Sequence, residues 1–194
     1  YAKAAHYLLA RFHELRHEHE RVCLLSSGEV TVSLGKNPGC GGRNQQFALE
    51  AALDLARYEG QPLAVLSAGS DGVDGNSPAA GAVADTTTIA RARSYNFDPE
   101  ATLQRFDACT LFTALGDTIM TGPTGNNLRD LRILIAGQAA GSCRLELHLR
   151  RLLRGRTGFE IVVVRLESGT VSPDVIGNLP DVGVVVAQSL VVAM

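Results

Sequence analysis

Apolar residues recur along the chain in two patterns, and the first of them predicts helices. Within the first twenty residues, apolar side chains return every three or four positions, at Ala5, Leu8, Leu9, Phe12 and Leu15. This is the spacing of an amphipathic helix, so a helix is expected over residues 2–20. The same spacing predicts a helix at residues 45–58, and a further helix is expected at 86–94 and a short helix or turn at 110–115. Asp98 followed by Pro99 is a typical helix start, which predicts a short helix over residues 98–106.

The second pattern consists of short apolar runs, which predict β-strands at residues 22–25, 30–34, 63–68 and 131–136. The first two runs are close in sequence, so we expect them to pair as a hairpin, which makes the sheet mixed rather than all parallel. The third run is expected inside the sheet. The predicted fold class is therefore α/β: a three-layer domain with a mixed β-sheet flanked by helices.

The length of the chain sets the domain organisation. Since domains contain about 100–200 residues, 194 residues form one domain, or one domain with an appendage. We assign residues 1–137 to the domain, with its α/β core from residue 20 onwards. Residues 138–194 form a tail of uncertain structure, with a helix predicted at 145–153 and strands at 159–166 and 182–192. Either the tail adds strands to the same sheet, or it is foreign to the domain through fusion or a change of reading frame.

Composition narrows the classes of function. The chain has 18 basic and 20 acidic residues and a net charge of −2, which argues against a nucleic-acid partner held by bulk charge. No apolar run reaches the roughly 18–20 residues of a membrane span, so no membrane partner is expected. The four cysteines lack the spacing of a zinc site or a disulfide framework, which favours the reducing cytoplasm: Cys23, Cys40, Cys109 and Cys143.

Three loops of glycine and small polar residues adjoin the predicted strands. The loop at residues 35–44 runs directly into the helix at 45–58, an order that offers backbone N–H groups and the positive end of a helix to an anion. The loop at 69–78 follows a strand, where open α/β sheets place their ligands. The third loop covers residues 121–127. A P-loop is excluded, because no GxxxxGK[ST] is present.

These loops resemble the MOFRL domain, the C-terminal half of the type-2 glycerate kinases. The chain has GGRNQ at 41–45, SAGSDGVDG at 67–75 and TGPTGNN at 121–127, where the family has GGRNQE, SAGTDGxDG and TGPTGTNVxDL. SGEVTV at 27–32 also resembles the family's GGETTV. The resemblance covers about residues 1–137, and three motifs in the same order make it specific. The chain departs from the family pattern at Ser27, Val30 and Gln46, and within the third motif.

The resemblance implies an ATP-dependent glycerate kinase, which transfers the γ-phosphoryl group of ATP to a hydroxyl of D-glycerate with Mg²⁺. This chain, which begins with Tyr1 and not with Met, is then expected to be its C-terminal part. Its partner is the missing N-terminal kinase domain, which supplies a lysine and most of the glycerate pocket. The implied catalytic residues are Arg43, Asp71 and Asp74. The implied cofactor-binding residues are Gly41, Gly42, Asn44, Gly72, Thr121, Gly122, Thr124 and Asn126.

The side chains suit this chemistry, although each also has a structural alternative. A guanidinium such as that of Arg43 binds phosphate or carboxylate through two parallel hydrogen bonds, but it can equally pair with a surface carboxylate. Asp71 and Asp74 are candidates for holding Mg²⁺ or accepting the hydroxyl proton, and Asp71 is the predicted metal ligand. Either aspartate can instead stabilise the following turn. We expect Arg43, Asp71 and the loop at 121–127 to converge on one cleft.

Two other classes of function stay open at this point. One is a hydroxypyruvate reductase-type oxidoreductase, although GCGGRN does not fit the GxGxxG of nicotinamide enzymes. The other is a truncated, non-catalytic ligand-binding module. Because transfer requires two substrates held in line, the chain alone is expected to be weakly active or inactive. An exposed cleft wall also favours self-association, so a homo-oligomer is a further expectation.

Overall fold

The computed structural model describes residues 1–32, 38–127, 129–137 and 185–189, and it confirms the predicted α/β class. The elements follow one another as α1 (Ala2–Glu18), β1 (Val22–Gly28), α2 (Arg43–Leu55), the 3₁₀ turn η1 (Ala56–Tyr58), β2 (Leu63–Gly69), β3 (Gly81–Asp85), α3 (Thr88–Ser94), α4 (Pro99–Gln104), α5 (Ala108–Leu115), β4 (Thr118–Ile119), β5 (Asp130–Ala136) and β6 (Val185–Ser189).

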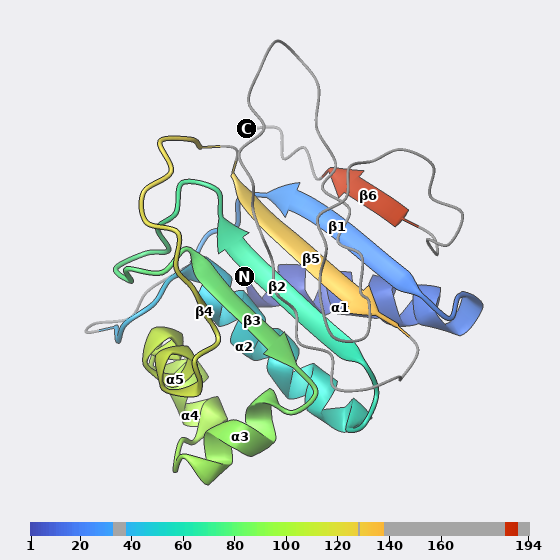
Figure 1. Ribbon diagram of the computed structural model, residues 1–194, viewed down its shortest axis with the longest axis horizontal. Coiled ribbons are helices and arrows are strands. Elements are labelled where there is room, and N and C mark those ends of the chain that lie inside the picture. The colour runs from blue at the N-terminus through green and yellow to red at the C-terminus, as the bar shows by residue number, and fades with distance from the viewer. Residues whose placement is uncertain (33–37, 128, 138–184, 190–194) are drawn as a thin grey trace.

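The strands form one sheet in the order β4-β3-β2-β5-β1-β6 (Figure 1). β5 lies between β2 and β1 and is antiparallel to both, while β6 is parallel to β1. The sheet is therefore mixed, as expected. The predicted strand at residues 63–68 corresponds to β2, which has a hydrogen-bonded neighbour on each side and a buried apolar core.

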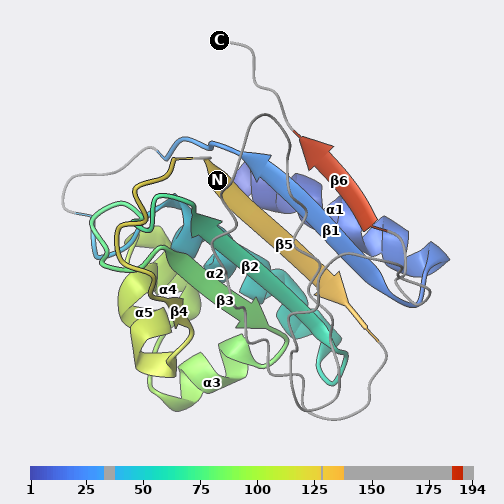
Figure 2. The ribbon, with the colours of Figure 1, turned by 45° about the horizontal axis from the view of Figure 1, so that its top comes forward.

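The helices cover one face of this sheet (Figure 2). One apolar cluster joins α1 and α2 to the side chains that β1, β2 and β5 direct to this face; its fully buried members include Phe47 of α2, Leu24 of β1 and Leu134 of β5. A second cluster joins α2, α3 and α5 to β3. The opposite face carries its own apolar cluster, which includes Leu66 and Ile133. The described residues thus form two layers, with helices on one side of the sheet and no helix on the other, so the three layers predicted from the sequence are wrong for this part of the chain.

The predicted hairpin of residues 22–25 with 30–34 is wrong. Residues 30–32 form no strand, and residues 33–34 lie outside the described residues. β1 runs on to Gly28 and pairs with β5 on one side and with β6 on the other. Both edges of β1 are therefore occupied by strands distant in sequence, which leaves none for its immediate successor.

β3 is an element that the apolar pattern did not predict. Alanine and glycine are weak strand formers, and they make up most of this strand. Glycine permits its close pairing with β2, because a Cβ on Gly81 would lie 1.9 Å from the carbonyl oxygen of Ser67. The predicted helix start at Asp98 and Pro99 is confirmed, since the Asp98 carboxylate accepts a hydrogen bond from the N–H of Ala101 at 2.9 Å.

Only a small part of the tail can be compared with its prediction. The helix expected at residues 145–153 and the strand expected at 159–166 lie outside the described residues. Within the strand expected at 182–192, β6 is described, and it extends the same sheet.

Candidate functional site

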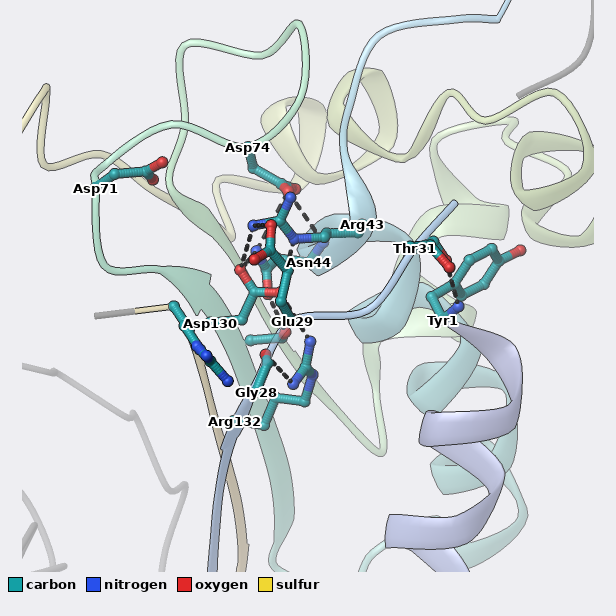
Figure 3. Close-up of polar contacts among 12 residues, drawn as sticks. Tyr1, Gly28, Glu29, Thr31, Arg43, Asn44, Asp71, Asp74, Asp130 and Arg132 are labelled. Atoms are coloured by element: carbon teal, nitrogen blue, oxygen red, sulfur yellow. Dashed lines mark hydrogen bonds and ion pairs between the residues drawn. The ribbon is translucent and has the colours of Figure 1, made fainter. Parts of the chain in front are cut away.

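The candidate site forms where three neighbouring strands reach the same end of the sheet. Asp130, the first residue of β5, stands between Gly28 of β1 and Gly69 of β2 in the strand pairing. The N-terminus of α2 lies at this end, so that Arg43 and Asn44 reach the carboxylate of Asp130 (Figure 3). The strand pairing and the helix start together bring the first two motifs to the residue that begins β5.

The N-terminus of α2 is closed by a carboxylate of the protein itself. Asp74, only 2% exposed, accepts hydrogen bonds from the backbone N–H of Asn44 at 3.0 Å and of Gln45 at 2.8 Å. A carboxylate is stabilised there because the helix N-terminus carries unpaired N–H groups and a partial positive charge. Burial nevertheless raises the pKa of the Asp74 carboxyl, against the opposing effect of these hydrogen bonds.

The expectation that this loop and helix start offer free amides to an anion is therefore wrong at several positions. Besides Asn44, the backbone N–H of Gly41 donates to the side chain of Asn76 at 2.8 Å, and that of Cys40 donates to Asp107 at 3.0 Å. Gly42 has a packing role, since a Cβ there would lie 2.3 Å from a carboxylate oxygen of Asp74. Side chains from later in the chain occupy the positions expected for a phosphate, and the ligand-binding roles of Gly41, Gly42 and Asn44 stay predictions.

Arg43 is held by a buried carboxylate. Its Nε donates to Asp130 Oδ2 at 2.7 Å and its Nη2 donates to Asp130 Oδ1 at 2.9 Å, while Glu29 lies 3.3 Å from the same Nη2. The Asp130 side chain is fully buried, and that of Arg43 is 31% exposed. The hydrogen bonds to Asp130 raise the pKa of the Arg43 guanidinium. The Arg43 side chain thus remains charged and partly exposed, and Asp130 holds it in place.

A second arginine completes this polar network. Arg132, 2% exposed, donates from Nη2 to Asp130 Oδ2 at 3.0 Å and from Nη1 to the carbonyl oxygen of Gly28 at 3.1 Å. Its guanidinium also lies 5.0 Å from the ring centre of Phe47. Burial lowers the pKa of Arg132, while its attraction to Asp130 opposes that shift. Asp130 is therefore shared by two cations.

Asp71 lies beside this network on the loop after β2 (Figure 3). Its half-buried carboxylate accepts a hydrogen bond from the backbone N–H of Val73 at 3.1 Å, which is the turn-stabilising alternative considered for it. Asp71 Oδ1 and the Asn44 side-chain amide both lie within 4 Å of the position that a Cβ on Gly69 would take. Asp71 is therefore close to the start of α2, and its roles in catalysis and Mg²⁺ binding stay predictions.

The third motif packs directly on the Asp71 loop. The backbone N–H of Thr124 donates to the carbonyl oxygen of Asp71 at 2.9 Å, and its hydroxyl donates to the carbonyl oxygen of Ser70. Thr121 donates its hydroxyl to the carbonyl oxygen of Gly122 at 3.0 Å. The backbone N–H of Asn126 donates to the Thr124 hydroxyl at 3.2 Å. Thr124 thus holds the two loops together, while the bonds of Thr121 and Asn126 lie within the third loop. Contacts from Gly72, Thr121, Gly122, Thr124 and Asn126 to a cofactor stay predictions.

The structure thus brings the three motif segments to one end of the sheet, as expected, while their sharing one cleft stays a prediction. It also adds residues that the motifs did not indicate. Asp130 and Arg132 received no role, although Asp130 corresponds to the aspartate of the TGPTGTNVxDL motif. An arginine within an otherwise apolar strand was a further signal, because a buried charge requires a partner. Among the described residues, no group of three side chains that could ligate a metal is present. No described helix is long and apolar enough to cross a membrane.

A sheet end that gathers GGRNQ, SAGSDGVDG and TGPTGNN around a buried Asp130 defines the class of domain. A model of the MOFRL family matches residues 22–130. The chain belongs to the MOFRL family.

Curated relatives connect this family with glycerate kinases. A D-glycerate 2-kinase of Thermotoga maritima is 40% identical over 110 residues, which make up 57% of this chain and 26% of the relative. A glycerate kinase of Danio rerio is 40% identical over 117 residues, or 58% of this chain and 23% of the relative. An Agrobacterium vitis protein with the provisional name hydroxypyruvate reductase is 42% identical over 115 residues, or 59% of this chain and 26% of the relative. The chain spans about a quarter of the length of these relatives.

A solved structure agrees with this assignment. The crystal structure of a glycerate kinase from Thermotoga maritima matches with a TM-score of 0.54 and 38% sequence identity, over 59% of this chain and 27% of that one. The resemblance to glycerate kinases inferred from the three motifs is therefore confirmed at the level of the family and of the fold.

Proposed function

We propose that this chain forms the C-terminal wall of a glycerate kinase active site and acts together with an N-terminal kinase domain. The observation that carries the proposal is the guanidinium of Arg43. It is partly exposed at the motif end of the sheet and is held from behind by the fully buried Asp130. Phosphoryl transfer depends on positioned positive charge more than on covalent chemistry by the protein, and a fixed arginine supplies such charge.

In this proposal, the γ-phosphoryl group of ATP passes to a hydroxyl of D-glycerate, and Arg43 binds the transferred phosphoryl group or the glycerate carboxylate. Asp71 accepts the hydroxyl proton or, in the alternative, would hold Mg²⁺. A single carboxylate fits Mg²⁺, because the ion is usually held by one or two carboxylates together with substrate phosphates and water. When bound, Mg²⁺ neutralises charge on the phosphates.

Asp74 has a different role in this proposal from the catalytic one suggested by its motif. Its two carboxylate oxygens accept the backbone N–H groups of Asn44 and Gln45, and the side chain is 2% exposed. It therefore acts as a positioning residue, because it fixes the helix that presents Arg43. Asp71 is the more exposed of the two aspartates.

The test is a coupled assay of ADP release from ATP, Mg²⁺ and D-glycerate. The chain is assayed alone and mixed with the Thermotoga maritima D-glycerate 2-kinase from which the matching quarter has been removed. We expect turnover only in the mixture, because precise placement of two substrates is worth about 7–11 kcal/mol and requires both walls. Arg43→Ala should abolish it. Arg93→Ala, at an exposed arginine on α3 that pairs with Glu100, is the matched control and should not.

A reductase function is the second candidate, because the Agrobacterium vitis relative carries that name. The same samples are therefore assayed for NADH oxidation with hydroxypyruvate. Oxidation of NADH without ADP release would refute the kinase proposal in favour of the reductase. Silence in both assays, with the mixture folded and associated, would favour a non-catalytic binding module.

A further inference from the structure

Asp130 differs from the other carboxylates near the site because it accepts hydrogen bonds from two arginine side chains. It is fully buried, and its two oxygens accept four hydrogen bonds: from Arg43 Nε at 2.7 Å, Arg43 Nη2 at 2.9 Å, Asn44 Nδ2 at 3.0 Å and Arg132 Nη2 at 3.0 Å. A carboxylate has about four lone-pair sites, so this one is fully used within the protein. It has no capacity left to bind a substrate directly.

The contact between Asp130 and Arg43 fixes the orientation of the guanidinium plane as well as the distance between the two side chains. Asp130 takes Nε and Nη2, which is one edge of the guanidinium, and Glu29 also lies nearest to Nη2. Neither contact uses Nη1. Two parallel hydrogen bonds to a planar group leave it little rotational freedom. The pair therefore sets the direction of the opposite edge of the guanidinium.

Both partners of this pair stand on rigid elements. Asp130 begins the central strand β5, with Gly28 of β1 and Gly69 of β2 beside it. Arg43 begins α2, whose N-terminus Asp74 closes through two backbone hydrogen bonds. A functional side chain keeps its geometry when the groups that hold it are themselves locked by packing and hydrogen bonds.

We propose that Asp130 is the positioning residue of Arg43, which it holds in the one orientation that turns the Nη1 edge towards an oxyanion such as a phosphate group. This inference rests on the proposed function for the nature of the anion, but the orientation itself does not depend on it. Arg132 stabilises the arrangement, because it shares Asp130 and supplies the second positive charge. The contribution of Arg43 to anion binding should therefore depend on Asp130.

The experiment measures how much Arg43 contributes to the binding of inorganic phosphate, with and without Asp130. Phosphate is titrated into the 194-residue chain and followed by NMR, for wild type, Arg43→Ala, Asp130→Asn and the double variant. We expect Arg43→Ala to weaken binding about tenfold in the wild type, or ~1.4 kcal/mol, and less than about twofold in the Asp130→Asn background. If Asp130 only lowered the local electrostatic potential, the effect of Arg43→Ala in that background would be equal or larger, and the proposal would be overturned.

A second readout separates this inference from the proposed function. The Nε–H resonance of Arg43, identified by its loss in Arg43→Ala, should be protected from exchange in the wild type and unprotected in Asp130→Asn. Protection that persists in Asp130→Asn overturns the positioning role. Loss of protection in a chain that binds no phosphate supports the positioning role and refutes the proposed function instead.

Two further variants complete the design. Asp130→Glu retains the charge but displaces the carboxylate by a methylene group, so it replaces Asp130→Asn in both readouts if the latter does not fold. Arg91→Ala and Asp117→Asn break the corresponding pair between α3 and the start of β4, and they should leave the phosphate affinity unchanged.

Discussion

Two arginine–aspartate pairs of this chain have similar contacts and different surroundings. In the site, Arg43 meets Asp130 at 2.7 and 2.9 Å. At the edge of the domain, Arg91 on α3 meets Asp117, next to β4, at 2.6 and 3.3 Å. The Asp130 side chain is 0% exposed and that of Asp117 is 20% exposed. Only Asp130 has a second, buried arginine on the same carboxylate.

From this difference we expect that burial of the carboxylate, and not the distance between the paired atoms, determines how much each ion pair stabilises the fold. A partly exposed pair exchanges contacts with water for contacts with each other, so its net contribution is small. A buried carboxylate that neutralises buried cations cannot be removed without leaving charge unpaired in a place that water does not reach. The Asp130 pair therefore defines a geometry, whereas the Asp117 pair only joins two surface elements.

The largest effect is expected from Asp130→Ala. It leaves Arg132 buried without its carboxylate and frees Arg43, so the free energy of unfolding should fall by about 3–5 kcal/mol. This is a large part of the 5–15 kcal/mol typical of a domain. Urea denaturation followed by circular dichroism measures it. A loss below about 1 kcal/mol would show that the two pairs are equivalent after all.

Two glycines, one near each pair, have a positive φ, but only one of them lies against neighbouring atoms. Alanine substitutions at both positions therefore separate the cost of backbone strain from the cost of a steric clash. Gly72, in the site, has φ +87°, and a Cβ there would lie 1.9 Å from the carbonyl oxygen of Gly122. Gly116, next to Asp117, has φ +75° and no atom within 4 Å of such a Cβ. Both alanine variants are strained, but Gly72→Ala should destabilise by about 1–3 kcal/mol more, because it also forces the two loops apart. Equal losses in urea denaturation would contradict this contact.

Asp74→Asn tests the carboxylate that closes α2. An asparagine can accept only one of the two backbone hydrogen bonds, so the expected loss of unfolding free energy is about 1–2 kcal/mol. Burial raises the folded pKa of Asp74 above 3.8, so the wild type loses stability relative to the variant as the pH rises from 3.8 through that raised pKa. The deficit of the variant should therefore be larger below this window than above it. Urea titrations at several pH values measure the difference, and a deficit that grows with pH would refute the assignment.

The smallest effect is expected from Asp117→Ala. Its partly exposed pair with Arg91 should contribute about 0.2–1 kcal/mol. The contribution should decrease in 1 M salt, where the screening length is about 3 Å. Denaturation at low and high salt measures both quantities. A loss as large and as insensitive to salt as that of Asp130→Ala would remove the distinction between the two pairs.

The parts of the fold that were predictable are those with a local signal. β2, β5 and α2 follow from apolar runs and helical spacing. The hairpin prediction failed because β1 pairs with strands that begin more than 100 residues later. A local pattern of apolar residues does not show which distant strand will be the partner. β3 was missed because its alanines and glycine signal close packing and not strand propensity.

The site shows the same limit. The motifs indicated Arg43, Asp71 and Asp74, and the structure places them at one end of the sheet. The motifs could not show which carboxylate pairs with which arginine or helix end. The glycine loop and helix start were expected to leave backbone N–H groups free for an anion. Asp74, about thirty residues later in the chain, accepts hydrogen bonds from two of these groups. Arg43 reaches its carboxylate 87 positions away.

The place of β5 between β1 and β2 also sets an order of assembly. During synthesis, β1 and β2 leave the ribosome before β5, yet the strand that joins them is the last of the three to appear. Until β5 enters, each of the two earlier strands keeps an open edge at which another chain can pair. Asp130 is the first residue of β5 and pairs with the last residues of β1 and β2. The contacts of Arg43 and Arg132 with Asp130 can therefore form only when β5 pairs with both strands and covers these edges.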